Sequence, residues 1–582
     1  MASKFLFALL VLYSVVGVAQ KPVPQLPQTY IDTTFSAPTG VTRAVHTSAS
    51  FQSALNSANP GDTIVLDAGA TYQGNFTLPV KSNPNNKWIY IVGSALSSLP
   101  APGTRVVPAT DAANMPKIVS PGATPVFTIA PGANHYRFVG LEITSASTQG
   151  CSAAQNCYTM ILVYAASVPN QPLVDSITVD RCYLHGTPTL DVREGVAANG
   201  SNIAVVDSYI SDIHQSTNDS QAIVAYYSPG PIKIVNNYLE ATGENIMFGG
   251  AGGPSNPWVP SDIEIRGNWL RKPLAWDAVG VTIGPGNKWV VKNILEIKSG
   301  RRVLIDGNTL ENSWCSGQAG WGFALTVRTG SSGNNAVVDD VQIQNNIIKN
   351  VSSGFTTLAQ DDVCASVSGC TNPGEMKRVV FYNNLFLLGD TTQLGYGGQA
   401  YAWGGIVIKG LSDFVLQHNT VIGPPNLGYC KASWYFEMSG SGSPTPPKSR
   451  THNVWVLDNV LCRQPWGPYG YIGQSSYVLT DYMGDPSTPP NDVTQRFKGN
   501  IMYLPLGDKV QQFPPHNFST DKRLQNSNEG EYRLNYPAKM ETSDGRVPGV
   551  DKAKLASAYS AESRTRLPTR SEGSTGPPKP KQ

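Results

Sequence analysis

The sequence contains few charged side chains. Asp, Glu, Lys and Arg make up 14% of the 582 residues, against about a quarter in an average globular protein. The net charge is only +2, so no whole-molecule field would attract nucleic acid, whose binding depends on many cationic contacts to phosphate. We expect no nucleic-acid partner, and any preference for an anionic ligand must come from a local patch.

Long apolar runs are absent beyond the first twenty residues. Those residues contain one cation, Lys4, and an apolar run over residues 5–18 that ends in small side chains. This pattern is typical of a secretory leader cleaved after Ala19, since a membrane-spanning helix needs about 20 apolar residues. We expect a secreted protein, extracellular or periplasmic, without membrane contact after cleavage.

Cysteine is scarce, and its spacing argues against zinc. The eight cysteines form no Cys-x-x-Cys pair and no Cys/His cluster, which are the usual signatures of a structural zinc site. In an exported chain they are available for disulfides instead. Candidate pairs are Cys151 with Cys157, Cys364 with Cys370, and Cys430 with Cys462.

One eight-residue pattern recurs ten times along the chain. Alternating apolar residues are followed by a polar residue, usually Asn, and then by two more apolar positions. The copies are ITVDRCYL, IAVVDSYI, IKIVNNYL, IEIRGNWL, VLIDGNTL, VQIQNNII, VVFYNNLF, FVLQHNTV, VWVLDNVL and RFKGNIMY, between residues 177 and 503. Regular recurrence at this length is typical of solenoids, and period-two alternation indicates strands.

The aligned polar position predicts how the coils stack. It is occupied by Cys182, Ser208, Asn237, Asn268, Asn308, Asn346, Asn384, Asn419, Asn459 and Asn500. Asn tolerates the left-handed backbone of a tight bend, and stacked Asn amides can bond from coil to coil. We therefore predict an all-β fold, a right-handed parallel β-helix with an asparagine ladder; an ordinary β-sandwich would not repeat one pattern in register.

The predicted organisation is one long domain with appended termini. Residues 51–59 suggest a capping helix, and the sequences YRLNYPAK and DGRVPGVD suggest a cap that shields the last coil edge. We expect a monomer. The expected boundaries are a signal peptide at 1–19, an N-terminal extension at 20–50, the β-helix at 51–505, a C-terminal cap at 506–563 and a disordered tail at 564–582.

The start of the solenoid carries a family resemblance. Residues 60–78 read PGDTIVLDAGATYQGNFTL, and this segment resembles the first coil of the pectin-lyase-like β-helix superfamily. The repeats carry the resemblance to about residue 503. It implies long loops on a rigid scaffold and a carbohydrate polymer as the partner.

A second strand in each coil is expected to carry the site. Candidates are AIVAYYS, NIMFGGA, ILEIKS, ALTVRTG and GIVIKG. Alternation points every second side chain outward, which places Glu296, Lys298, Thr326, Arg328 and Lys409 on the outer face. Lys298, Arg328 and Lys409 would then form a cationic stripe suited to carboxylates or sulfates.

Tryptophan is concentrated in the same stretch. Six of the eleven tryptophans lie between residues 258 and 321, and flat aromatic faces make good sugar platforms. We take Trp276, Trp314 and Trp321 as candidate substrate-binding residues. The alternative is that these indoles pack under long loops.

Two short segments are similar to the catalytic region of the chondroitinase-B and alginate lyase family. They are Glu296-Ile297-Lys298-Ser299, with GNTLEN after it, and Leu325-Thr326-Val327-Arg328 on the next coil. The similarity implies Lys298 and Arg328 as catalytic residues. Calcium is the cofactor that it implies, with Glu244 and Glu296 as the nearest metal-binding candidates.

These residues suit β-elimination from a uronic-acid polymer. That reaction needs neutralisation of the sugar carboxylate, removal of the adjacent proton and protonation of the leaving oxygen. Lys298 could be the base if Arg301, Arg302 and Arg328 lower its pKa, and Arg301, Arg302 and Lys409 could bind substrate.

Two other functions remain open from the sequence. One is glycoside hydrolysis, although the adjacent pairs Asp339/Asp340 and Asp361/Asp362 would point to opposite faces of a strand. The other is a glycan-binding or surface β-helix protein without catalysis. The charged residues could also be solvated or paired with Glu296 and Asp306.

Overall fold

The computed structural model describes most of the solenoid and parts of both termini. The described residues are 21–122, 124–145, 159–163, 171–250, 258–276, 289–314, 320–328, 336–359, 375–389, 406–409, 411–423, 437–439, 452–462, 469–470, 473–474, 493–503, 518–520 and 542–562. The predicted disulfide partners lie outside these residues, apart from the backbone of Cys462. Cys182 is a buried free thiol.

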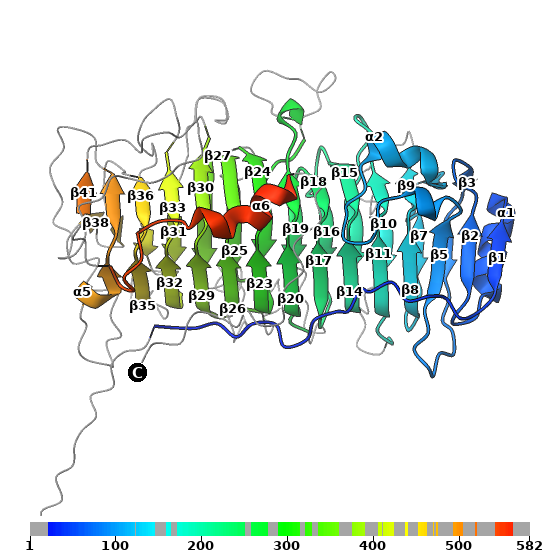
Figure 1. Cartoon of the computed structure of the whole chain (residues 1–582), viewed down its shortest axis with the longest axis horizontal. Coiled ribbons are helices and arrows are strands. Elements are labelled where there is room, and N and C mark those ends of the chain that lie inside the picture. The colour runs from blue at the N-terminus through cyan, green and yellow to red at the C-terminus, as the bar shows by residue number, and fades with distance from the viewer. Residues whose placement is uncertain are drawn as a thin grey trace, which may run out of the picture.

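The chain winds into three long sheets whose strands lie side by side (Figure 1). Among the described strands, every pairing is parallel apart from the terminal β37–β38 contact, and one isolated antiparallel bridge joins Thr187 to Leu190. The predicted right-handed parallel β-helix is therefore confirmed. Sheet A consists of β1 (Thr42–Val45), β2 (Thr63–Leu66), β5 (Ile89–Gly93), β8 (Asn134–Val139), β11 (Asp175–Asp180), β14 (Ser201–Val206), β17 (Ile232–Val235), β20 (Ser261–Arg266), β23 (Gly300–Asp306), β26 (Val337–Gln344), β29 (Glu375–Tyr382), β32 (Ser412–Gln417), β35 (His452–Leu457) and β39 (Phe497–Lys498).

Sheets B and C complete each coil. Sheet B consists of β3 (Thr71–Gln73), β6 (Lys117–Ser120), β9 (Glu142–Ser145), β12 (Tyr183–His185), β15 (Tyr209–Ile213), β18 (Tyr238–Ala241), β21 (Trp269–Arg271), β24 (Thr309–Ser313), β27 (Ile347–Val351), β30 (Leu385–Leu388), β33 (Thr420–Ile422), β36 (Val460–Cys462), β40 (Ile501–Tyr503) and β41 (Phe518–Thr520). Sheet C consists of β4 (Phe76–Leu78), β7 (Phe127–Ile129), β10 (Thr159–Val163), β13 (Glu194–Ala198), β16 (Gln221–Ala225), β19 (Glu244–Phe248), β22 (Leu295–Ile297), β25 (Trp321–Thr326), β28 (Ser353–Leu358), β31 (Ile406–Lys409), β34 (Glu437–Ser439), β37 (Tyr469–Gly470) and β38 (Gly473–Gln474).

Apolar side chains stack in register along the inside of the coils. On sheet A, Ile203 pairs with Ile232, which in turn pairs with Ile263, and all three are almost completely buried. Alternation of the strand directs these residues inward together. Burial of this continuous column by neighbouring coils is what stabilises a solenoid.

The asparagine ladder is present at the bend between sheets A and B. Each side-chain amide from Asn237 to Asn459 donates to the Oδ1 atom of the next ladder residue at 2.9–3.1 Å. Ser208 joins the row by donating its backbone N–H to Asn237. We expected the left-handed backbone at the ladder position, but the preceding residue adopts it, as at Asn236 and Asn345. One residue therefore turns the backbone, and the next makes the hydrogen bonds of the ladder.

Helix α1 (Ser48–Ser57) covers the first coil (Figure 1). Thr47 caps it by accepting from the backbone N–H of Ser50. Phe51 and Leu55 face the core and are fully buried. The expected capping helix is thus confirmed and begins three residues earlier than predicted. The other helical turns are η1 (Leu96–Ser98), α2 (Pro108–Asp111), η2 (Ala112–Asn114), η3 (Leu274–Trp276), α5 (Val493–Arg496), η4 (Lys552–Leu555) and α6 (Ala556–Ala561).

The N-terminal strap, residues 21–40, lies across the strands of sheet A (Figure 1, dark blue). It includes four prolines, which favour an extended chain and lack N–H donors. Its contacts are therefore mainly with side chains of the coils. They include Lys21 Nζ to Gln417 Oε1 (2.5 Å), Gln25 N to Asp340 Oδ1 (3.0 Å), Gln28 N to Asp262 Oδ1 (2.8 Å), Lys233 Nζ to Ile31 O (2.9 Å) and Arg137 Nη2 to Thr33 O (2.8 Å).

The C-terminal strap, residues 542–562, lies along the flank of sheet B (Figure 1, red). Leu555 and Ala558 pack against Ile347 and Leu385, and the backbone of Ala558 accepts from the hydroxyl of Thr309. DGRVPGVD therefore covers the sides of several coils and not the open edge of the last coil, as the sequence had suggested. YRLNYPAK lies outside the described residues.

No described helix is both long and apolar enough to cross a membrane.

Candidate functional site

The outer face of sheet C carries the predicted site strands. The five predicted segments contribute β16, β19, β22, β25 and β31, and all lie in this one sheet. Leu295 and Ile297 are fully buried in the core, so Glu296 lies on the opposite, outer face. Alternation therefore orients β22 as the sequence predicted.

Lys298 and Arg328 lie on adjacent coils. The backbone N–H of Arg328 donates to the carbonyl of Lys298 at 3.0 Å. The Lys298 ammonium lies 3.5 Å from Glu296 Oε2 and 3.0 Å from the sulfur of Met247. Its side chain is 14% exposed, so it is largely but not completely enclosed.

Two carboxylates lie next to this lysine on neighbouring strands. Glu244 is fully buried and Glu296 is 3% exposed. Gln221 donates to Glu244 Oε2 at 2.7 Å, whereas Glu244 Oε1 has no hydrogen-bond partner within the described part of the chain. The amide of Asn293 lies 3.4 Å from Glu296 Oε2. Oxygen atoms of this kind are ligands for calcium.

Charge and burial decide the protonation of this group. Burial raises the pKa of Glu244, and the neighbouring Glu296 raises it further. Burial opposes the charged form of Lys298, but Glu296 and Glu244 outweigh it and raise the pKa of Lys298 above its ordinary value. The sequence made a base role for Lys298 conditional on arginines that lower this pKa. That condition is not met, because the acidic neighbours outweigh the other effects on Lys298.

Several site residues were not singled out from the sequence. Lys292 pairs with Asp219 at 2.6 Å, and Gln221 holds Glu244. Gln221 occupies the same register position as Glu194 and Glu244 on the adjacent strands. Alignment of the sheet C strands with one another would have found this polar row, as it found the asparagine row.

Arg301 and Arg302 belong to a different face. Both lie on β23 of sheet A, where Arg302 makes two bonds to Asp262 at 2.7 and 2.9 Å. Arg301 lies 3.9 Å from Asp339. The outer face of sheet C therefore does not include these predicted substrate-binding residues. Lys409 lies on β31 of sheet C, but its side chain is outside the described part.

The three predicted tryptophan platforms are buried. Trp276 is 6% exposed, Trp314 1% and Trp321 8%. Trp276 and Trp314 pack with Trp289 in one apolar cluster, and Trp321 packs on Ala324. An indole enclosed in this way has no free face for a sugar ring, so these three side chains are buried packing residues and not platforms.

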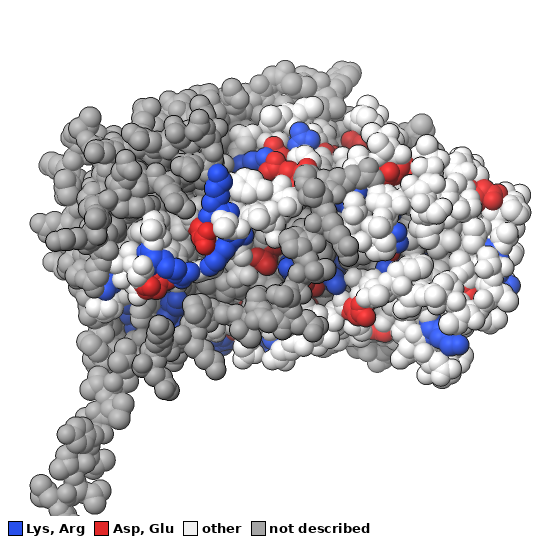
Figure 2. Space-filling model, in the orientation of Figure 1, with Lys and Arg blue, Asp and Glu red and all other residues white. Residues whose placement is uncertain are grey.

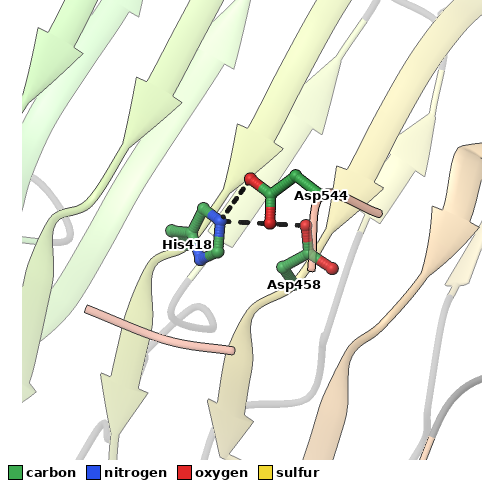
Figure 3. Close-up of side chains that lie close together, drawn as sticks. All are labelled: His418, Asp458 and Asp544. Carbon is green, nitrogen blue, oxygen red and sulfur yellow. Dashed lines mark hydrogen bonds and ion pairs between the residues drawn. The ribbon is translucent and has the colours of Figure 1, made fainter. Parts of the chain in front are cut away.

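A second group of polar side chains joins the C-terminal strap to the coils (Figure 3). His418, Asp458 and Asp544 have potential metal-binding atoms within 4.8 Å of one another. Asp544 accepts from His418 at 3.0 Å and from Arg546, and these bonds hold its pKa well below the usual range although burial opposes ionisation. The carboxylate of Asp458 accepts from Ser543.

Because donors already fill these carboxylates, the group is a clasp between segments and not a favourable metal site. Lys21 of the N-terminal strap interacts electrostatically with both Asp458 and Asp544. On the face shown in Figure 2, cationic and acidic side chains are interspersed along this flank. Pairs such as Lys349 with Glu562 account for that arrangement.

Comparisons with known proteins find only distant structural likenesses. No family model and no curated protein matches the sequence. Among solved structures, an alginate lyase from Paenibacillus sp. str. FPU-7 is 15% identical with a TM-score of 0.33, covering 66% of this chain and 94% of that one. The PL6 family alginate lyase AlyGC is 14% identical with a TM-score of 0.40; the alignment covers 88% of this chain but only 58% of AlyGC. A polygalacturonase from Erwinia carotovora ssp. carotovora is 12% identical with a TM-score of 0.34, covering 67% of this chain and 96% of that one. At these values none of them carries an activity over to this chain.

Proposed function

We propose that this protein is a secreted polysaccharide lyase that cleaves an acidic, uronic-acid-containing polymer by β-elimination. The observation that supports it best is the grouping on sheet C. A partly accessible lysine, an arginine on the next coil and two buried carboxylates lie within neighbouring strands. This combination offers positive charge for a uronate and groups that can transfer a proton.

The proposed roles follow from position. Arg328 neutralises the sugar carboxylate, because a guanidinium is always charged and binds carboxylates through two parallel donors. Lys298 is the proton-transferring residue: after losing its own proton to solvent, its amine would take the proton adjacent to the sugar carboxylate and, as an ammonium, return it to the leaving oxygen. Its side-chain nitrogen lies beside Glu296. Glu296 orients the ammonium through their ion pair.

Calcium is the proposed cofactor. Glu244 and Glu296 would hold it, together with side-chain amide oxygens on the same face of sheet C, such as those of Gln221 and Asn293. The unpartnered, buried Oε1 atom of Glu244 fits this assignment, because a buried carboxylate oxygen is costly without a partner. A bound cation would also offset the effect of Glu296 on Glu244, which raises the pKa of Glu244. When bound, calcium would supply positive charge at the site.

The variant Lys298→Ala tests this proposal. Loss of a proton-transferring group should reduce turnover at least about 100-fold while the unfolding temperature stays close to that of the wild type. Formation of unsaturated uronic ends is the measurement. Lys349→Ala is the matched control, because Lys349 is also a half-buried, ion-paired lysine but lies on sheet B. A Lys298→Ala protein with unchanged turnover would refute the assignment.

The second candidate function is glycan binding without cleavage. Because the tryptophans are buried, a glycan would bind to the polar outer face of sheet C. Under this alternative, the intact polymer binds and Lys298→Ala weakens its affinity, but neither unsaturated ends nor new reducing ends form.

A further inference from the structure

A buried lysine lies beneath the carboxylate pair of the site. Lys272 follows β21 and is completely buried. Its ammonium donates to the backbone carbonyls of Ala241 (2.8 Å), Thr242 (3.0 Å) and Gly243 (2.9 Å), and to Asn245 Oδ1 (3.1 Å). Four oxygen atoms thus surround one positive charge, as ligands surround a bound cation.

These oxygen atoms all belong to the turn that delivers Glu244 to the site. The turn links β18 to β19, and Glu244 stands between two of the residues that contact the ammonium. Without the ammonium, the carbonyls of Ala241 and Gly243 would lose this buried donor, at a cost of about 1–3 kcal/mol for each group left unpaired. The carbonyl of Thr242 would keep the backbone N–H of Lys292. The path of the backbone at Glu244 therefore depends on Lys272.

The same turn is fixed from the neighbouring coil by Ser220. The Ser220 hydroxyl contacts the hydroxyl of Thr242 at 2.8 Å and accepts from the N–H of Gly243 at 3.2 Å. The backbone carbonyl of Ser220 accepts from Glu244 N–H at 3.0 Å. A Cβ atom at Gly243 would approach the backbone of Ser220 within 2.5 Å, so the turn packs closely against that coil and leaves no room for a side chain.

We propose that Lys272 is a positioning residue of the sheet C site. Its side-chain nitrogen donates to four oxygen atoms of the turn at Ala241–Asn245 and thereby holds the Glu244 carboxylate beside Glu296, where the two can share a calcium ion. This inference rests on the calcium site included in the proposed function. Lys272 itself touches neither substrate nor metal.

Calcium titration of the purified protein by isothermal calorimetry tests the proposal without reference to activity. Lys272→Met preserves the length of the side chain but removes the charge and the donors. We expect it to weaken calcium binding about 10-fold or more, which is the usual effect of losing a residue that orients a metal ligand. The half-saturating calcium concentration for cleavage should rise by the same factor.

Lys233→Met is the matched control. Lys233 also donates to a backbone carbonyl, that of Ile31, but it lies on sheet A. The calcium affinity of the Lys233→Met protein should equal that of the wild type. A purely structural role for Lys272 would lower the unfolding temperature and leave the calcium affinity of the folded variant unchanged, and that result would overturn the proposal.

A second variant covers the case in which Lys272→Met does not fold. Ser220→Ala removes the opposing contact to the same turn without exposing a buried charge, and it should weaken calcium binding several-fold. Unchanged affinity in this folded variant would count against the proposal. If the wild-type protein binds no calcium, the calcium site of the proposed function is refuted. If the wild type and the Lys272→Met protein bind calcium equally well, only the positioning role of Lys272 is refuted.

Discussion

Each asparagine of the ladder makes several buried hydrogen bonds at once. Asn346 donates to Ile305 O at 3.1 Å and to Asn384 Oδ1 at 2.9 Å. Its own Oδ1 atom accepts from both the backbone and the side chain of Asn308 at 2.9 Å. Removal of the amide would leave several of these groups buried and unpaired.

Asn346→Ala should therefore lower the free energy of unfolding by about 3 kcal/mol or more. Asn345→Gly is the control, because Asn345 has a positive φ of 56° that glycine adopts without strain. It should cost less than about 1 kcal/mol, since Asn345 is only partly buried. Denaturant unfolding followed by circular dichroism compares the two. Equal losses would contradict the division of labour between the adjacent positions.

The ladder and the strands could be predicted because their signals are local and repeat. The left-handed residue was assigned one position too late. In pairs such as Asn236-Asn237 the same residue type both turns the backbone and forms the ladder, so the sequence does not tell the two positions apart. The environment of Lys272 could not be predicted, since backbone carbonyls form most of it and these leave no mark in the sequence. The tryptophans were misassigned because their number does not reveal which loops cover them.

The outer side of β18 carries a different row, built from aromatic rings and acids. Tyr238 stacks on Tyr209 with ring centroids 4.1 Å apart, and its hydroxyl is bonded to Glu240. Glu240 is only 7% exposed. Burial raises the pKa of Glu240 to about 7, and the nearby charge of Asp212 contributes.

This row predicts a pH dependence of stability. Between the unfolded value of 4.5 and about 7, the folded protein keeps a proton on Glu240 that the unfolded chain releases. Stability should therefore fall as the pH rises through this window and level off above it. Glu240→Gln should make the decline shallower in thermal unfolding between about pH 5 and about pH 8. An unchanged slope would show that Glu240 ionises normally.

The two straps connect coils that are distant along the solenoid. A simple solenoid is stabilised by contacts between neighbouring repeats and can fray from its ends. Here the N-terminal strap crosses from β32 to β2, and Lys21 approaches Asp544 of the C-terminal strap at the clasp. These long-range contacts have no repeating signature, which is why the sequence revealed neither strap path.

Deletion of residues 21–36 should weaken this coupling. We expect a lower unfolding temperature and faster amide hydrogen exchange on sheet A between β8 and β32, because local openings no longer have to break strap contacts. Lys233→Met, which removes a single strap contact, should show only a small part of the effect. Exchange that changes solely in the first coils would mean that the strap does not couple the solenoid.

The central claim is that the face of sheet C bearing Lys298 cleaves uronate polymers by elimination. The most direct test is incubation of the mature protein with alginate, pectate and chondroitin-type polymers, with and without calcium, while the ultraviolet absorbance of unsaturated uronic products is followed. The proposal predicts a rising absorbance with one of these polymers, dependent on calcium and lost in Lys298→Ala. No rise with any of them, together with intact polymer length, would contradict it and favour a glycan-binding protein.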